Sequence, residues 1–184
     1  MRLTALPTLF ALAVVCAGAL ALSQTPDQAK TAHHDTEFLQ NANQGSVDEI
    51  DLAQMVLKKS YNSDVKNFAQ RMVRDHTQLL NNLKPFDNQA GLQAPDHPDA
   101  ATLAEEKRLD KLSARECERA YIKLMVEDHH KDLEAFIAEE RTTGNPALKT
   151  AVGQAEKVVK EHLEDANNIA REDGLATAPI PSGA

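Results

Sequence analysis

Apolar residues recur at steps of three and four along three long segments, the spacing that places them on one face of an α-helix. The first face consists of Val65, Ala69, Met72, His76, Leu79, Leu83 and Phe86. The other two consist of Ile122, Val126, His129, Leu133 and Phe136, and of Leu148, Val152, Ala155, Val159, His162, Ala166 and Ile169. The pattern predicts amphipathic helices that bury one face, and each face carries a single histidine.

Breaks in this pattern divide the chain into helices. A first helical piece ends at Gly45-Ser46, where Ser46 and Glu49 have the spacing of a capping box. Further helices are expected over 47–60, 64 to at least 84, 99–112, 114–142 and 146–173, and Pro85 should bend or end the second of these. Short turns join antiparallel neighbours. We therefore predict an all-α fold, an antiparallel four-helix bundle of two helical hairpins joined by a long connection with a short extra helix.

The first residues have the features of a signal peptide. Arg2 precedes an apolar run, and Ala19-Leu20-Ala21 has the small-residue form that signal peptidase recognises. A retained membrane anchor is the alternative, because the run approaches the length that spans a bilayer. Lipidation at Cys16 is disfavoured by the bulky Val15 before it. We expect export, cleavage near Ala21 and no retained membrane span.

These signals divide the chain into four parts. Residues 1–21 are the expected signal peptide, 22–34 a polar, flexible lead-in, 35–173 the helical bundle, and 174–184 a disordered tail rich in Pro, Gly and Ala. The 184 residues suffice for one domain of ordinary size.

The net charge limits the kinds of partner to expect, and the cysteine content limits the disulfide bonds. The net charge is −8 and no basic stripe is present, so we expect no nucleic-acid partner. Cleavage of the leader leaves Cys117 as the single cysteine, which cannot form an intramolecular disulfide. Its place beside an apolar face predicts a buried thiol.

The three histidines also agree in height along the helices. Glu49 and His76 lie 13 and 14 residues from the first hairpin turn near residue 62. His129 and His162 lie 16 and 17 residues from the second turn near residue 145. Because the rise per helical residue is constant, each pair should share one level. The sequence leaves open whether the two hairpins dock with these levels aligned.

This layer has two interpretations. Glu49, His76, His129 and His162 could bind one Zn, Fe or Cu ion, since imidazole and carboxylate ligands suit all three metals. Alternatively, the buried imidazoles find hydrogen-bond partners and fix the register of the helices. Val73 and Val159 stand where a Glu-x-x-His pair would need glutamate, so we predict neither a two-metal carboxylate centre nor ferroxidase chemistry.

An acid directly precedes each of these histidines. Asp75, Asp128 and Glu161 lie about 100° around the helix from the histidine that follows. They therefore flank the buried face, where each could orient an imidazole of a neighbouring helix or simply be solvated. The histidines outside the three faces are expected in solvent, except His130, which lies near enough to serve as a spare ligand.

Several of these segments resemble a known family. They are Phe38-Leu39, Glu49-Ile50, residues 65–77 (VKNFAQRMVRDHT), Ala120-Tyr121, Met125-Val126, His129 and Glu161-His162-Leu163. Over about residues 35–172 the chain resembles the secreted bacterial ferritin-like family catalogued as domain of unknown function 4142. The resemblance implies a ferritin-like bundle exported to the periplasm or outer envelope, and no established activity.

Two departures from the family pattern bear on these expectations. Cys117-Glu118 stands where the family tends to have Phe-Asp, which keeps a carboxylate and makes Glu118 a further candidate to orient the site. A proline usual near residues 156–158 is absent, which implies a straighter last helix.

These observations support three candidate functions, which we rank. The first is an envelope protein that binds a metal in stress or metal handling, and the second is a structural or interaction protein of the envelope without enzymatic activity. An enzyme with an open metal position comes third, because nothing in the chain names a substrate. No partner is identified, and both a homo-oligomer and an envelope partner are compatible with the sequence.

Overall fold

The computed structural model describes residues 26–182, and this part of the chain consists of five α-helices without a β-strand. They are α1 (Pro26–Lys59), α2 (Ser63–Ala90), α3 (Ala100–Asp110), α4 (Ala114–Thr142) and α5 (Pro146–Glu172). The prediction of an all-helical chain is confirmed. The expected signal peptide, residues 1–21, lies outside the described residues.

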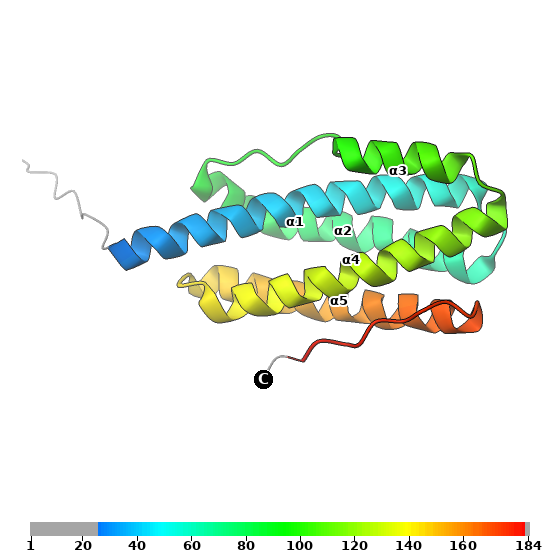
Figure 1. Ribbon diagram of the computed structural model, residues 1–184. Helices are drawn as coiled ribbons and strands as arrows, with labels where there is room; N and C mark the ends of the chain where they lie inside the picture. The colour runs from blue at the N-terminus through cyan, green and yellow to red at the C-terminus, as the bar shows by residue number, and fades with distance from the viewer. Residues whose placement is uncertain (1–25, 183–184) are drawn as a thin grey trace, which may run out of the picture.

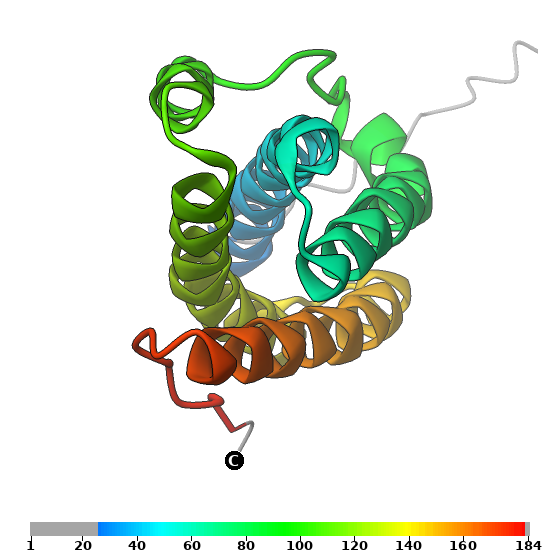
Figure 2. The ribbon, with the colours of Figure 1, turned by 90° about the vertical axis from the view of Figure 1, so that its right-hand side faces the viewer.

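The four long helices lie side by side as two hairpins. Helix α1 packs against α2, and α4 packs against α5 (Figure 1). The hairpins meet through contacts of α2 with α5 and of α1 with α4, and α3 lies outside them against α1 and α4 (Figure 2). The aliphatic side chains of the four long helices form one core between them. None of the described helices contains an apolar stretch long enough to cross a membrane.

Local capping explains where the helices begin and end. The Asn62 side chain accepts hydrogen bonds from the backbone N–H groups of Asp64 and Val65 at the start of α2. Ser113 and Glu116 form a reciprocal capping box at the start of α4, as the sequence predicted. Gly91 ends α2 with a left-handed φ of 69°, a conformation that glycine adopts without steric cost.

The expected helix break at Gly45-Ser46 is wrong, and Pro85 does not end α2. Helix α1 is continuous through Gly45-Ser46, and buried Ser46 donates its hydroxyl hydrogen to the Ala42 carbonyl instead of capping a new helix. Pro85 lies inside α2, which continues to Ala90. The last turn of α2 is held by a buried hydrogen bond from Asn43 Nδ2 to Asp87 Oδ1 (2.8 Å), so a contact between helices outweighs the local effect of the proline.

The structure places a helix and a packed segment where the sequence predicted a lead-in and a tail. Helix α1 begins at Pro26, so most of the predicted flexible segment 22–34 is helical. After α5 the chain turns back along the bundle, and Leu175, Ala178 and Ile180 pack against the core. The Asn167 side chain exchanges two hydrogen bonds with the backbone of Ala178, which anchors this segment. The structure describes this segment to residue 182.

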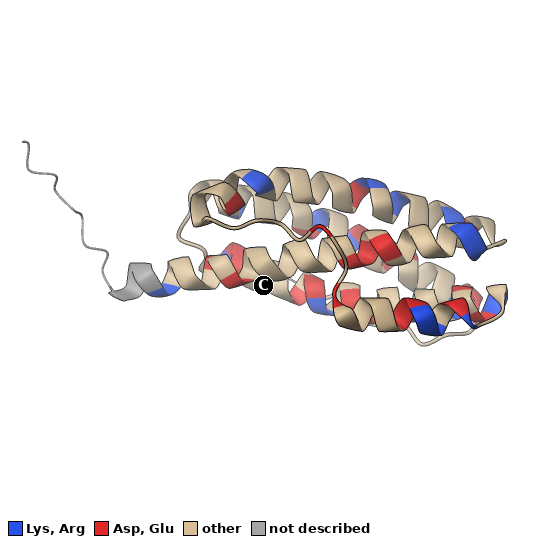
Figure 3. Ribbon diagram, turned by 90° about the horizontal axis from the view of Figure 1, so that it is seen from above, with Lys and Arg blue, Asp and Glu red and all other residues tan. Residues whose placement is uncertain are grey.

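Charged side chains of both signs are interspersed along the outer faces of the helices. In the view of Figure 3, Lys and Arg alternate with Asp and Glu instead of forming a basic stripe. The buried thiol expected at Cys117 is confirmed, since this side chain lies in the core.

Candidate metal centre

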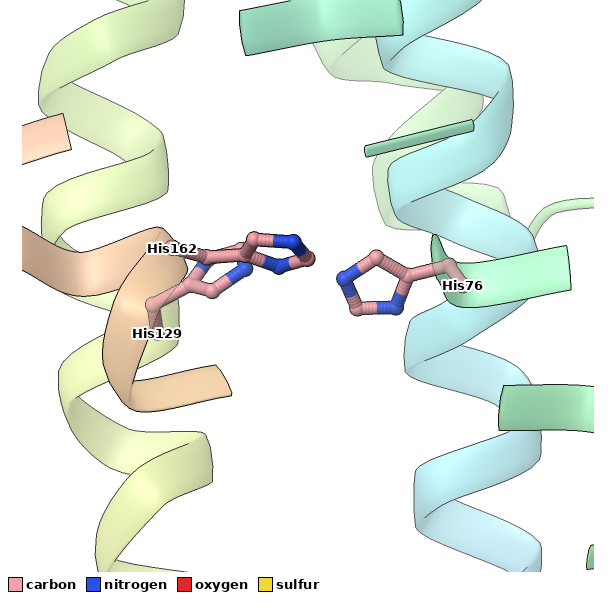
Figure 4. A group of neighbouring side chains, drawn as sticks. All are labelled: His76, His129 and His162. Atoms are coloured by element: carbon pink, nitrogen blue, oxygen red, sulfur yellow. The ribbon is translucent and has the colours of Figure 1, made fainter. Parts of the chain in front are cut away.

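Three buried imidazoles meet in the middle of the bundle. His76 comes from α2, His129 from α4 and His162 from α5, and their relative exposures are 3%, 0% and 0%. Their ring centroids are 5.3–5.6 Å apart. Figure 4 shows the rings pointing toward one another across the space between the helices. The two hairpins therefore dock with their histidine levels aligned, the point that the sequence left open.

The outer nitrogen of each ring faces a hydrogen-bond acceptor. His76 Nδ1 lies 3.1 Å from Glu49 Oε2, and His129 Nδ1 lies 3.1 Å from the Met125 carbonyl and 3.2 Å from Glu49 Oε1. His162 Nε2 lies 3.0 Å from Asp75 Oδ2. The Met125 carbonyl and the Asp75 carboxylate only accept, so we assign the ring protons of His129 and His162 to the outer nitrogens. The outer nitrogen of His76 carries the proton when Glu49 is ionised.

The remaining nitrogen of each ring has no partner. His76 Nε2, His129 Nε2 and His162 Nδ1 are all buried without a hydrogen bond. One ring nitrogen from each histidine lies within 4.8 Å of those from the other two. With the protons on the outer nitrogens, these inner nitrogens carry lone pairs. The layer is therefore a set of three buried electron-pair donors that face one space.

Burial keeps these imidazoles neutral. Loss of solvent lowers the pKa of His129 to about 4. It also lowers the pKa of His162 to about 2, with further lowering from His129 and Arg71. Burial and the two neighbouring histidines place the pKa of His76 well below its usual range. Neutral imidazole is the form that ligates metals, so the site needs no deprotonation at neutral pH.

Glu49 is one of two carboxylates that contact the outer side of this layer. It comes from α1 and is almost fully buried, and burial raises its pKa well above the usual range, with added repulsion from Asp132 and Asp128. Its two oxygens contact His76 and His129, so it links α1 to α2 and α4. The sequence placed Glu49 in the ligand set, and the contacts observed for it are with the outer nitrogens.

Asp75 acts on His162 from the neighbouring helix. Its carboxylate is itself held by Arg71, whose Nε lies 3.1 Å from Asp75 Oδ2. Arg71 also contacts Asp165 (2.7 Å) and Glu161 on α5. This network fixes the orientation of Asp75 and ties α2 to α5 beside the histidines.

The other three predicted orienting acids lie elsewhere. Glu161 pairs with Arg71 and points away from the ring that follows it. Glu118 accepts hydrogen bonds from the Ser60 hydroxyl (2.6 Å) and the backbone N–H groups of Tyr61 and Asn62, which secures the turn between α1 and α2. Asp128 pairs with Lys131 at 3.2 Å. Their observed contacts are structural and do not include the three imidazoles.

A cavity of about 240 Å³ reaches this layer from the seam between α1 and α4. Its lining includes Glu49 and His76 as well as Glu37 and Asp132. Burial raises the pKa of Asp132 to about 7, with repulsion from Asp128 adding to the effect. A cation or small molecule could therefore approach the histidines along a wall that carries carboxylates.

Sequence reasoning missed Arg71 and Asp132. Asp132 follows His129 by three residues and Arg71 precedes Asp75 by four, both spacings that bring side chains together on a helix. Those spacings were a signal, but a weak one, because they recur throughout charged helices.

Comparisons with known proteins identify a family. The model of the family described as Domain of unknown function (DUF4142) matches residues 20–169, which is most of the chain. No curated protein and no solved structure matches the sequence.

Proposed function

The chain belongs to the DUF4142 family, and on that premise we propose that it is an exported, ferritin-like four-helix bundle that binds one transition-metal ion through His76, His129 and His162. Its place would be the periplasm or outer envelope, in metal handling or stress protection. The observation that carries the proposal is the set of three unpartnered inner nitrogens on buried, neutral rings.

The hydrogen-bonding capacity of the layer supports a metal. A buried polar group without a partner costs about 1–3 kcal/mol, so three together are a substantial penalty. A single water donates at most two hydrogen bonds and would leave one of the three nitrogens unpaired. A metal ion accepts all three lone pairs at once, which removes the whole penalty.

The outer contacts of the rings support the same conclusion. Histidine ligands commonly donate the other ring N–H to a carboxylate or a backbone carbonyl, which fixes the tautomer and raises ligand basicity. Glu49, Met125 and Asp75 provide these acceptors here. In this proposal Glu49 and Asp75 orient the ligands. Glu49 could become a fourth ligand only by giving up its contacts with His76 and His129.

The ligand set restricts the choice of metal. Three imidazoles suit Zn, Cu and Fe, and three protein ligands are typical of sites that keep a position for water or another small ligand. The cavity beside His76 would supply access to that position. Substrate chemistry is not part of the proposal.

A second candidate function is a register layer in a structural or interaction protein. The specific observation in its favour is that Glu49 and Asp75 connect the three histidines into a network spanning α1, α2, α4 and α5. This hypothesis expects replacement of all three histidines by Leu to leave the fold intact or to stabilise it. It also expects chelators to have no effect on the melting temperature.

The deciding experiment measures metal in the mature protein expressed without a His-tag. We expect about one equivalent of metal by plasma mass spectrometry, and a rise in Tm when Zn²⁺, Cu²⁺ or Fe²⁺ is added to the chelated protein. His162→Ala should abolish the bound metal, whereas His97→Ala, which alters an exposed histidine, should retain it. Absence of metal together with an unchanged Tm would refute the proposal.

Export has its own test. The full chain and a chain lacking residues 1–21 would be expressed with the same epitope at the C-terminus, and periplasmic and cytoplasmic fractions compared. We expect only the full chain to reach the periplasm and to be shortened by about 21 residues, as read by N-terminal sequencing.

A further inference from the structure

A second group of potential ligands lies where α1 begins and α4 ends. It consists of His34 and Asp35 on α1 and Glu139 on α4, and one ligand atom from each lies within 4.8 Å of the others. His34 Nδ1 is 2.8 Å from Glu139 Oε2. The contacts observed for these three residues do not include the three histidines, and the sequence predicted that His34 faces solvent.

The two carboxylates of this group are poorly satisfied. Glu139 is fully buried, and among the described residues its Oε1 has no hydrogen-bond donor, while the carboxyl groups of Glu139 and Asp35 lie close enough to share a proton. Asp35 Oδ1 is likewise buried without one, whereas Asp35 Oδ2 accepts a hydrogen bond from Thr143 Oγ1 at 3.1 Å. A buried carboxylate oxygen that lacks a donor is costly, and two in one group require a compensating positive charge.

The protein supplies only part of that charge. Within residues 26–182 the observed ion pair of Glu139 is with His34, whose side chain is half exposed. Burial raises the pKa of Glu139 to about 7, and repulsion from Asp35 adds to this while His34 opposes it.

We propose that His34, Asp35 and Glu139 form a second, solvent-accessible site for a divalent transition-metal ion. One imidazole and two carboxylates are the nitrogen and oxygen ligands that Zn²⁺ and similar ions accept. The half-exposed ring of His34 lets the ion reach the buried oxygens, so the site would exchange with solvent faster than the enclosed three-histidine layer.

The position of the group suggests what the site does. The cavity that reaches Glu49 and His76 is also lined by His34, further back along α1. An ion held at His34 would therefore lie at the entrance of the path to the three histidines. A role in delivering the ion to the three histidines rests on the proposed function, but the existence of the second site does not.

The test is a Zn²⁺ titration of the mature, untagged chain at pH 7.5, by calorimetry and by competition with a chromophoric chelator. We expect two classes of site in the wild-type protein. His34→Ala should weaken the second class by about tenfold or more, since even removal of an orienting partner costs 10–100-fold. His33→Ala is the matched control, because His33 is the exposed neighbour that pairs with Glu37 outside the group.

Two further variants separate this site from the three-histidine layer. Glu139→Gln keeps the shape of the side chain but removes its charge, and should eliminate the weaker class alone. His162→Ala should eliminate the tighter class alone. If Glu139→Gln fails to fold, His34→Ala decides, because a half-exposed side chain is dispensable for packing.

The outcomes are distinct. Zn²⁺ binding that is the same in wild type, His34→Ala and His33→Ala would overturn the proposal and leave a carboxylate pair that shares a proton. A single, weaker class in the wild-type protein that His34→Ala weakens and His33→Ala retains would count against the three-histidine site and not against this one.

Discussion

Asp75 Oδ2 lies 3.0 Å from Nε2 of His162, although Asp75 directly precedes His76 in the sequence. The acid therefore orients the imidazole of another helix and not the ring of its own neighbour. Glu161 directly precedes His162, and its observed contact is with Arg71 and not with an imidazole of another helix. This relationship makes Asp75 and Glu161 a matched pair for testing which acid serves the site.

Replacement of Asp75 should weaken metal binding without removing a ligand. In Asp75→Asn the side-chain amide can donate toward His162 Nε2, which would shift the ring proton to the inner Nδ1 and take away its lone pair. We expect a 10–100-fold loss of Zn²⁺ affinity in chelator competition. Glu161→Gln changes an acid that does not contact the ring, so affinity within about twofold of wild type is expected. Equal losses in the two variants would contradict the assigned role of Asp75.

The elements of the fold that depend on local signals could be predicted from sequence. The capping box at Ser113, the stop at residues 142–146 and the three histidine faces are set by residues within one or two helical turns of one another. The pairing of Glu49 with His76 also followed, because a short turn fixes the relative height of two antiparallel helices.

Contacts between the two hairpins could not be predicted in this way. The pairing of Asp75 with His162 and the second contact of Glu49 with His129 depend on how the hairpins dock. Similarly, Ser46 resembles an N-cap in sequence but lies inside α1, where packing against α2 and α4 keeps the helix continuous. Tertiary packing thus overrode the local signal.

Glu118 should matter for stability more than for the metal. Burial raises its pKa, but hydrogen bonds from Ser60, Asn62 and Tyr61 outweigh burial and hold the pKa of Glu118 below its usual range. Glu118→Ala leaves backbone donors of the turn unpaired, so we expect a loss of about 1–3 kcal/mol in urea denaturation with metal binding retained. Glu127→Ala, which removes an exposed pair with Lys123, should cost no more than about 0.5 kcal/mol. Similar losses in both would argue against this role.

One substitution should detach the segment after α5 from the bundle. Asn167→Ala removes both hydrogen bonds to the backbone of Ala178, and we expect it to speed proteolysis within residues 175–182. The free energy of unfolding should fall by about 1–2 kcal/mol, the range for two neutral hydrogen bonds that water partly replaces. Asn168→Ala is the control, because the exposed Asn168 contacts only Arg171 among its observed partners. Unchanged cleavage in Asn167→Ala would show that apolar packing alone holds the segment.

The neutral histidines predict how stability depends on pH in the metal-free protein. In the unfolded chain a histidine binds a proton near pH 6.5, whereas burial holds the pKa of His162 at about 2 in the folded state. The unfolded state therefore binds more protons below pH 6.5, and His162 makes the protein less stable as the pH falls from that value. At neutral pH and above, both states are unprotonated and the effect vanishes.

Other groups also titrate on folding, among them Glu49, whose raised pKa has the opposite effect on stability at low pH. A comparison of wild type with His162→Leu separates the contribution of one ring from theirs. The advantage of His162→Leu in free energy of unfolding should grow by about 1.4 kcal/mol for each pH unit below 6.5, measured by urea denaturation at pH 7.5, 6.0 and 5.0 in chelator. His97→Leu, at an exposed position, should run parallel to wild type. A parallel curve for His162→Leu as well would mean that this ring takes up its proton at the same pH in the folded and unfolded states, which would contradict a buried ring held neutral below pH 6.5.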